Sequence, residues 1–205
     1  AALTRAQRLG YEFLYTGAMY RAVALAALRA GLDLRDEPAL TDLMQTLHLE
    51  MPPGGRVLLG GEDVTYVIRS REVTMATGAV SDSPAVRRCL TRMQRTIAAG
   101  RDMVCEGRDQ GTLVFPDAAC KFFLVADPLE RARRRQREMA ARGEMVELEQ
   151  LLRDQEIRDQ RDAARNLAPM KPADDAVLLD STELGPEQVV EAMEAEVRHR
   201  APRGL

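Results

Sequence analysis

The sequence predicts an α/β fold in which a parallel sheet carries helices on both faces. Short apolar runs at 11–15, 103–105 and 120–126 are bounded by turn residues, as buried parallel strands are. Strand and helix patterns alternate in the first and last thirds of the chain, which is typical of a parallel sheet with covering helices. At 205 residues the chain is long enough for one packed core with an accessory lobe.

The first part of the chain is expected to open with a helix that ends at Gly10, followed by the strand at 11–15. Apolar residues at helical spacing over 18–30 predict a second helix, and Gly31 provides its stop. A third helix is expected at 40–47.

The character of the sequence changes at Leu49, after which prolines and paired glycines surround two short apolar runs. These runs, 56–59 and 64–68, are expected to be strands joined by turns. They predict a small β-containing insertion, after which a helix follows at 86–99.

The last part is expected to contain two charged helices, 128–142 and 147–165, and a strand at 177–180. Gly143 lies between the two helices and is a candidate hinge. We therefore expect these helices to move together as a lid.

The composition indicates a globular protein, with 45% apolar residues, 30% charged residues and a net charge of −3. No apolar run is long enough to cross a membrane. Three cysteines without a CxxC spacing favour a reducing, cytoplasmic location over a disulfide framework or a zinc site. Five arginines lie within 131–137, but Glu130 and Glu138 flank them, which predicts a solvated helix face rather than a nucleic-acid surface.

The strongest chemical motif is Cys-Glu-Gly-Arg-Asp-Gln-Gly-Thr at 105–112, directly after a predicted buried strand. Open α/β sheets bind ligands at this end of their strands. The glycines allow close backbone approach, Arg108 offers a planar fork for phosphate oxygens, and Asp109 places an acceptor beside it. A turn held by an Arg-Asp ion pair is the alternative explanation.

Two weaker elements accompany this motif. The segment Tyr-Thr-Gly-Ala-Met-Tyr-Arg at 15–21 leads a strand end into a helix whose free N–H groups can meet an anion, with Arg21 one turn into the helix. Arg158, Asp162 and Arg165 are spaced i, i+4 and i+7, which places them on one stripe of a helix. The alternatives are a solvated Arg21 and salt bridges within the helix.

In their order and spacing, these segments resemble the bacterial cytidylate kinase family. The resemblance rests on 15–21, on Gly-Glu-Asp-Val-Thr at 61–65, on Glu-Gly-Arg-Asp-Gln-Gly-Thr-Leu-Val-Phe-Pro at 106–116, on Arg-Asp-Gln-Arg-Asp at 158–162 and on Asp-Ser-Thr at 180–182. It implies a nucleoside monophosphate kinase with a P-loop core (1–48, 87–127 and 169–205), an NMP-binding insertion (49–86) and a helical lid region (128–168).

The resemblance implies that ATP, with Mg²⁺, phosphorylates CMP or dCMP. It assigns catalytic roles to Arg108, Arg158 and Arg165. It assigns CMP binding to Thr16, Arg21, Thr77, Arg87, Arg108, Asp109, Arg158, Asp162 and Arg165. Thr16, Arg21 and Arg108 are expected on the phosphate side of CMP. Arg87 and Asp109 are expected at the base, where cytosine offers a donor to the carboxylate and acceptors to the guanidinium.

The chain departs from the family pattern in three places. The family's first strand and glycine-rich P-loop would lie before Ala1, so we expect a segment that carries them, and with them the ATP-binding residues, to precede the chain. Tyr15 stands where the family usually has aspartate. The base-contacting serine expected before Arg87 does not stand out in the sequence, and Thr77, beside Gly78, is the nearest hydroxyl candidate.

Three hypotheses about function follow. The preferred one is an active cytidylate kinase, a monomer whose partners are CMP, dCMP and ATP, with neither nucleic acid nor membrane involved. The second is a CMP-binding protein without kinase activity. The third is a regulatory or interaction protein that retains only the fold.

Overall fold

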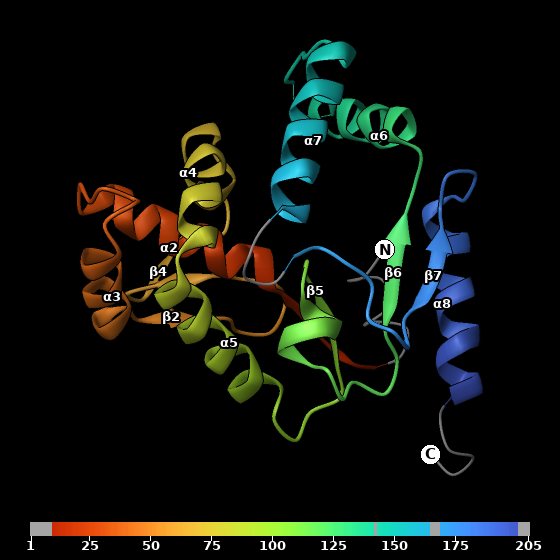
Figure 1. Cartoon of the computed structure of the whole chain (residues 1–205), viewed down its shortest axis with the longest axis horizontal. Helices are drawn as coiled ribbons and strands as arrows, with labels where there is room; N and C mark the ends of the chain where they lie inside the picture. The colour runs from red at the N-terminus through yellow and green to blue at the C-terminus, as the bar shows by residue number, and fades with distance from the viewer. Residues whose placement is uncertain (1–9, 142, 165–168, 201–205) are drawn as a thin grey trace. The chain divides into compact units, whose positions relative to one another are not determined.

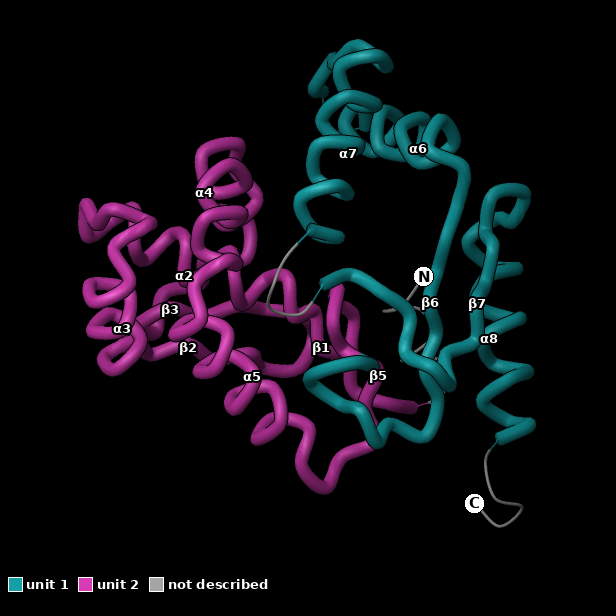
Figure 2. The backbone as a smooth tube through the Cα atoms, in the orientation of Figure 1, with its two compact units in different colours: residues 1, 111–205 teal, residues 2–110 magenta. Residues whose placement is uncertain are grey.

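The computed structural model describes residues 10–141, 143–164 and 169–200. The chain divides into two compact units, one formed by residues 2–110 and one by residues 111–205 (Figure 2). The helix expected before Gly10 lies outside the described residues.

The unit of residues 2–110 contains two parallel strands, three short antiparallel strands and four helices among its described residues (Figure 1). Its elements are β1 (Glu12–Tyr15), α2 (Thr16–Arg29), α3 (Glu37–Thr46), β2 (Leu49–Glu50), β3 (Leu58–Leu59), β4 (Glu62–Asp63), the 3₁₀ turn η1 (Val67–Arg69), α4 (Arg71–Asp82), α5 (Pro84–Ala98) and β5 (Met103–Glu106).

Strands β1 and β5 pair in parallel, with Glu12 opposite Met103 and Tyr15 opposite Glu106. Helix α2 begins at the residue after β1 and is buried along most of its length. It packs against α4, and its many alanines permit close approach of the neighbouring helix. The predicted junction of strand and helix at Tyr15 and Thr16 is therefore confirmed.

The 49–63 segment forms the expected small β region, because β2, β3 and β4 pair as a three-stranded antiparallel sheet. The prediction of a strand at 64–68 was wrong. The chain forms η1 there, because Ile68 N–H bonds back to the carbonyl of Val64 and Arg69 N–H to that of Tyr66. These local bonds occupy donors that a strand ladder would need.

Helix α4 was not predicted. Its interior holds Gly78 and β-branched residues, which lower helix propensity. The Ser70 hydroxyl caps it by accepting from Val73 N–H at 3.3 Å, and the helix buries Val73, Ala76 and Val80 on one face. Packing of this face therefore outweighs the intrinsic preference.

The unit of residues 111–205 begins within a short π-helical turn, η2 (Gln110–Val114). Its other described elements are β6 (Phe122–Val125), α6 (Pro128–Ala140), α7 (Leu148–Ala163), β7 (Val177–Asp180) and α8 (Pro186–Arg200). The two predicted helices and the strand at 177–180 are thus confirmed, whereas α8 was not predicted. Val189, Val190 and Met193 form its buried face.

Strands β6 and β7 also pair in parallel, with Phe122 opposite Val177 and Val125 opposite Asp180. Parallel pairing is therefore confirmed in both units, although each parallel sheet has two strands among the described residues. The main apolar cluster lies between residues 14 and 90, with Leu14, Met19 and Leu90 almost fully covered. Among the described helices, none has the length and apolar character needed to span a membrane.

Candidate nucleotide site

Three of the predicted site residues of the unit 2–110, Thr16, Arg87 and Asp109, lie together where β1 and β5 end. Thr16, which is 2% exposed, donates its hydroxyl hydrogen to the carbonyl of Glu106 at 2.8 Å. This bond ties the first residue of α2 to the last residue of β5. The carboxyl ends of parallel strands are where such sheets bind ligands, so this edge is the candidate site.

Arg87 and Asp109 form a buried ion pair at this edge. The guanidinium Nη2 of Arg87 donates to Oδ2 of Asp109, and both side chains are less than 10% exposed. Nη1 of Arg87 donates to the carbonyl of Ser81 at 2.9 Å, and the guanidinium carbon lies 5.7 Å from the ring centroid of Tyr20. The structure thus brings together the two residues expected at the base.

Two glutamines that the sequence analysis missed extend this cluster. Gln94 is fully buried, and its Oε1 accepts from Nε2 of Gln110 at 3.3 Å. The same Nε2 lies 3.4 Å from Thr16 Oγ1 and 3.4 Å from Asp109 Oδ1. The Gln110 amide therefore joins Thr16, Asp109 and Gln94. Gln94 follows Arg87 by seven residues on α5, a spacing that places both on one helix face and could have indicated it.

Gly107 is required by this arrangement. A Cβ atom at position 107 would lie 2.5 Å from Thr16 Oγ1 and 2.6 Å from Gln110 Nε2. Both distances are well below van der Waals contact, so a larger residue would displace the two polar groups. The sequence predicted that the glycines of this motif allow a ligand to approach the backbone closely. In the structure, Gly107 leaves the space that the side chains of Thr16 and Gln110 occupy.

The other three predicted residues of this unit have different surroundings. Arg21 donates to the carbonyl of Ile68 at 3.1 Å and to Thr74 Oγ1 at 2.7 Å, so it joins α2 to the 68–74 region. Arg108 is exposed. Thr77 donates its hydroxyl hydrogen to the carbonyl of Val73 at 2.6 Å within α4.

The structure brings Ser81, rather than the side chain of Thr77, to Arg87. Ser81 is 8% exposed, its carbonyl accepts from Arg87, and its hydroxyl donates to the carbonyl of Thr77 at 2.7 Å. The Thr77 hydroxyl is directed into its own helix by its bond to Val73.

Tyr15, the departure from the family pattern, packs over the start of α2. A Cβ atom at Gly17 would lie 2.9 Å from Cε2 of the Tyr15 ring. The ring therefore covers the position after Thr16, and only a residue without a side chain fits beneath it.

The predicted stripe of α7 belongs to the other unit. Asp162 is 4% exposed, and its Oδ2 lies 3.9 Å from Nε of Arg158, whose side chain is 61% exposed. Arg165 lies outside the described residues. A bond of 2.6 Å from Arg131 Nη1 to Asp159 Oδ2 joins α6 to α7.

The prediction that the arginines of 131–137 form a solvated face was wrong for Arg131 and Arg134. Both are half-buried, and both make contacts outside α6, because the helix packs against α7 and lies beside the segment after β7. Arg133, Arg135 and Arg137 are exposed, as expected.

The carboxylates of the described residues do not form a metal cage. No group of three or more His, Cys, Asp or Glu side chains in the described ranges lies close enough to hold a metal ion. Mg²⁺ that accompanies a nucleotide takes most of its ligands from phosphates and water, and needs few carboxylates.

Comparison with known proteins bears on what this site serves. The family model described as cytidylate kinase matches residues 1–199. The chain belongs to the cytidylate kinase family. It is 47% identical over 202 residues to the cytidylate kinase of Citrifermentans bemidjiense, covering 97% of this chain and 87% of that protein. It is 45% identical over 204 residues to the cytidylate kinase of Pseudomonas aeruginosa strain LESB58, with 97% and 88% covered.

A third relative, the cytidylate kinase of Pelotomaculum thermopropionicum, is 46% identical over 195 residues, which are 93% of this chain and 86% of that protein. Membership of the cytidylate kinase family confirms the resemblance, the α/β class of a P-loop kinase, and the preference for an enzyme over a binding or regulatory protein. The chain is a transferase of the nucleoside monophosphate kinase class, and the family implies ATP-dependent phosphoryl transfer.

Proposed function

We propose that the chain transfers the γ-phosphoryl group of ATP to CMP or dCMP, giving CDP or dCDP and ADP. The observation that carries this proposal is the buried Arg87–Asp109 pair at the carboxyl ends of β1 and β5, in a chain of the cytidylate kinase family. A carboxylate and a guanidinium fixed side by side are complementary to the donor and acceptor edge of cytosine.

Base selection follows from the chemistry of that edge. The exocyclic N4 amine of cytosine donates, whereas N3 and O2 accept. Asp109 can accept from the amine and Arg87 can donate to the ring. Uracil would set its O4 acceptor against the Asp109 carboxylate, which leaves both acceptors without a hydrogen, so UMP is expected to bind poorly.

The phosphate side of CMP is assigned to Thr16, Arg21 and Arg108. Phosphoryl transfer depends on positioning and charge stabilisation more than on covalent catalysis. Arg108 is exposed, so its guanidinium can bind phosphate oxygens bidentately. Mg²⁺ bound with ATP would neutralise part of the phosphate charge.

The 128–168 region is assigned the role of a lid. Within this region, Arg158 and Arg165 would bind the transferring phosphoryl group, and Asp162 would contribute to CMP binding. Thr77, which lies outside this region in α4, would also contribute to CMP binding. The high exposure of Arg158 supports this assignment, because a guanidinium in solvent is available to a ligand. Closure over the nucleotides would exclude water and so limit ATP hydrolysis. The monomeric state and the cytoplasmic location stay predictions.

The test is a coupled assay for ADP release with CMP, dCMP, UMP and AMP as acceptors, together with calorimetry of CMP binding. We expect turnover with CMP or dCMP well above that with UMP and AMP. Binding of CMP without turnover would favour a binding protein, and equal binding of all four nucleotides would contradict the proposal.

A further inference from the structure

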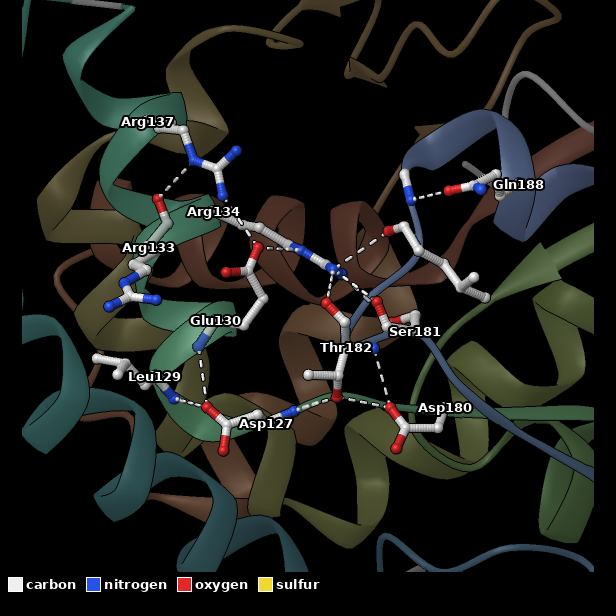
Figure 3. Close-up of polar contacts among 12 residues, drawn as sticks. Asp127, Leu129, Glu130, Arg133, Arg134, Arg137, Asp180, Ser181, Thr182 and Gln188 are labelled. Carbon is white, nitrogen blue, oxygen red and sulfur yellow. Dashed lines mark hydrogen bonds and ion pairs between the residues drawn. The ribbon is translucent and has the colours of Figure 1, made fainter.

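Arg134 makes a dense set of contacts between α6 and the segment that follows β7 (Figure 3). Its Nη2 donates to the carbonyls of Ser181 at 2.6 Å, Thr182 at 3.2 Å and Leu184 at 3.3 Å. Nη1 lies 3.3 Å from Ser181 Oγ, and Nε donates to Glu130 Oε1 at 3.1 Å. Every nitrogen of this guanidinium therefore has a partner.

The partners of Arg134 are themselves fixed. Ser181 is 5% exposed, and both its N–H, at 2.8 Å, and its hydroxyl, at 3.0 Å, donate to the carbonyl of Val125 at the end of β6. The hydrogen bond from Arg134 lowers the pKa of Glu130, and the charge of Arg137 lowers it further. Arg134 thus binds a segment that the sheet already holds.

A second connection lies beside this one in Figure 3. Asp127 caps α6 by accepting from Leu129 N–H at 2.8 Å, and its own N–H donates to Thr182 Oγ1 at 2.9 Å. The Thr182 hydroxyl donates to Asp180 Oδ1 at 2.6 Å, and this bond, followed by the one from the Thr182 N–H, lowers the pKa of Asp180. The N-cap residue of α6, Asp127, and Arg134 within α6 are therefore both hydrogen-bonded to the segment that follows β7.

Helix α6 is in turn hydrogen-bonded to α7. Arg131, one turn from Arg134, bonds to Asp159 of α7, which is the neighbour in sequence of Arg158. Gln155 Nε2 also reaches from α7 to the carbonyl of Pro128 at 3.1 Å. The position of Arg158 therefore depends on α6, and the position of α6 depends on Arg134.

We propose that Arg134 is a positioning residue of phosphoryl transfer: by anchoring α6 to residues 181–184, it sets where α7 presents Arg158. This inference rests on the proposed function, since it assigns Arg158 to the transferring phosphoryl group. Arg134 itself is directed at backbone carbonyls, so it acts through α6 and α7 and not as a catalytic residue.

The geometry demands arginine at this position. The planar guanidinium presents five donors in a fork, whereas a lysine has one nitrogen at a single point. A lysine at 134 retains the positive charge, but one ammonium group does not reach Glu130, Ser181 Oγ and the carbonyls of 181–184 together. Arg134→Lys therefore tests whether the positive charge is sufficient or whether the hydrogen bonds of the guanidinium are needed.

The experiment compares wild type, Arg134→Lys and Arg134→Gln, with Arg137→Gln as the matched control. Arg137 lies on the same helix and shares Glu130 as a partner, at 2.9 Å, but its hydrogen bonds with described residues stay within α6. For each protein we would measure kcat and KM for CMP, the Kd of CMP by calorimetry, the melting temperature, and amide hydrogen exchange over 128–140 and 181–185.

We expect both Arg134 variants to lose kcat by roughly 10- to 100-fold, since small misplacements of a positioning group have effects of this size. The Kd of CMP should rise far less than kcat falls, because the residues assigned to the base, Arg87 and Asp109, lie outside α7, and exchange over 181–185 should become faster. Arg137→Gln should resemble wild type in all of these measurements. The split between kcat and Kd identifies positioning, because general unfolding would weaken both.

Wild-type kcat and exchange in folded Arg134→Lys would overturn the inference, and so would equal losses in Arg137→Gln. If wild type binds CMP but does not phosphorylate it, the proposed function fails. Hydrogen exchange still decides the anchorage in that case, and unchanged exchange over 181–185 in Arg134→Gln would contradict it independently.

Discussion

The two units hold their candidate nucleotide residues in opposite physical states. In the unit of residues 2–110, Arg87 and Asp109 are 6% and 4% exposed, and each is already bonded to a protein partner. In the unit of residues 111–205, Arg158 has a 61% exposed side chain, and its ionic partner among the described residues, Asp162, lies 3.9 Å away. The pair proposed to bind the base is therefore preformed, whereas the arginine proposed to bind the phosphate is exposed to solvent.

This difference has an energetic meaning. A buried ion pair holds its geometry because separating it would leave a charge without water or partner. An exposed pair gains little from its partner and is free to exchange it for a ligand. We infer that recognition of the base relies on a rigid site, and that stabilisation of the transferring phosphate relies on side chains that become ordered when the ligand binds.

The largest effect is expected from breaking the buried pair. Asp109→Ala leaves Arg87 buried without its carboxylate, which should lower the free energy of unfolding by about 3–5 kcal/mol. It should also weaken CMP binding far more than ATP binding, because the carboxylate is the group proposed to bind the base. Urea unfolding and calorimetry measure the two effects.

Glu62→Ala provides the matched control for Asp109→Ala, since Glu62 pairs with Arg29 at 2.6 Å with both side chains about half exposed. Its stability loss should be much smaller. Asp109→Asn, which preserves the shape of the side chain, separates loss of base recognition from loss of fold. Equal weakening of CMP and ATP binding in Asp109→Asn would contradict the assignment.

The second prediction concerns the exposed arginine. Arg158→Gln should reduce kcat by roughly 10²- to 10³-fold, as removal of one transition-state donor does. The free energy of unfolding should change by less than about 1 kcal/mol, because the Arg158 side chain is 61% exposed and its Nε lies 3.9 Å from the buried Asp162 carboxylate. Steady-state kinetics and urea unfolding on the same preparation provide both values.

Arg153→Gln is the control, because Arg153 lies on the same helix, is 60% exposed and pairs with Glu149 at 3.6 Å. It should retain wild-type kcat. A large stability loss in Arg158→Gln with little change in kcat would contradict the inference that the exposed arginine serves the reaction and not the fold.

The third prediction tests how tightly the preformed site is packed. Gly107→Ala places a methyl group against Thr16 and Gln110, which should destabilise the fold by roughly 1–3 kcal/mol and weaken CMP binding. Gly185→Ala is the control, because a Cβ there meets only Gln188 Oε1 at an ordinary 3.5 Å. Wild-type CMP affinity in Gly107→Ala would show that the Thr16 and Gln110 positions do not matter for the nucleotide.

Much of the fold could be predicted from the sequence because its signals are local. The strand at 177–180 and the junction of strand and helix at Tyr15 follow from apolar runs and turn residues that act within a few positions. Helix α4 was missed because Gly78 and its threonines weaken the local signal, while the packing of Val73, Ala76 and Val80 is a tertiary effect. The strand at 64–68 was wrong because local 3₁₀ bonds competed for its donors.

The candidate site was predictable where a motif concentrates chemistry in a few residues. Arg108 and Asp109 stand out between two glycines, and the family resemblance supplied Arg87. Gln94 and Arg134 were missed because their roles arise from partners distant in the sequence: Gln110 is 16 residues from Gln94, and Ser181 is 47 residues from Arg134. An isolated glutamine or arginine on a helix carries no sign of such partners.

The smallest effect is expected at Gln94. It tests whether one polar side chain of the buried site serves the stability of the fold or the affinity for CMP. Gln94 is wholly covered, yet its Nε2 has no hydrogen-bond partner among the described residues. Burying such a donor costs stability, so Gln94→Met, which fills a similar volume, should be neutral or stabilise the fold by up to about 1 kcal/mol.

The same substitution removes the acceptor that holds the Gln110 amide, so Thr16 and Asp109 lose their shared neighbour. We therefore expect a weaker CMP affinity together with an unchanged or higher melting temperature, whereas Leu90→Ala, which removes an apolar side chain on the same helix, should lower the melting temperature. Stability and CMP affinity falling in parallel in Gln94→Met would mean that Gln94 serves packing. Opposite changes would mean that this buried polar group is retained for the nucleotide, at some cost to the fold.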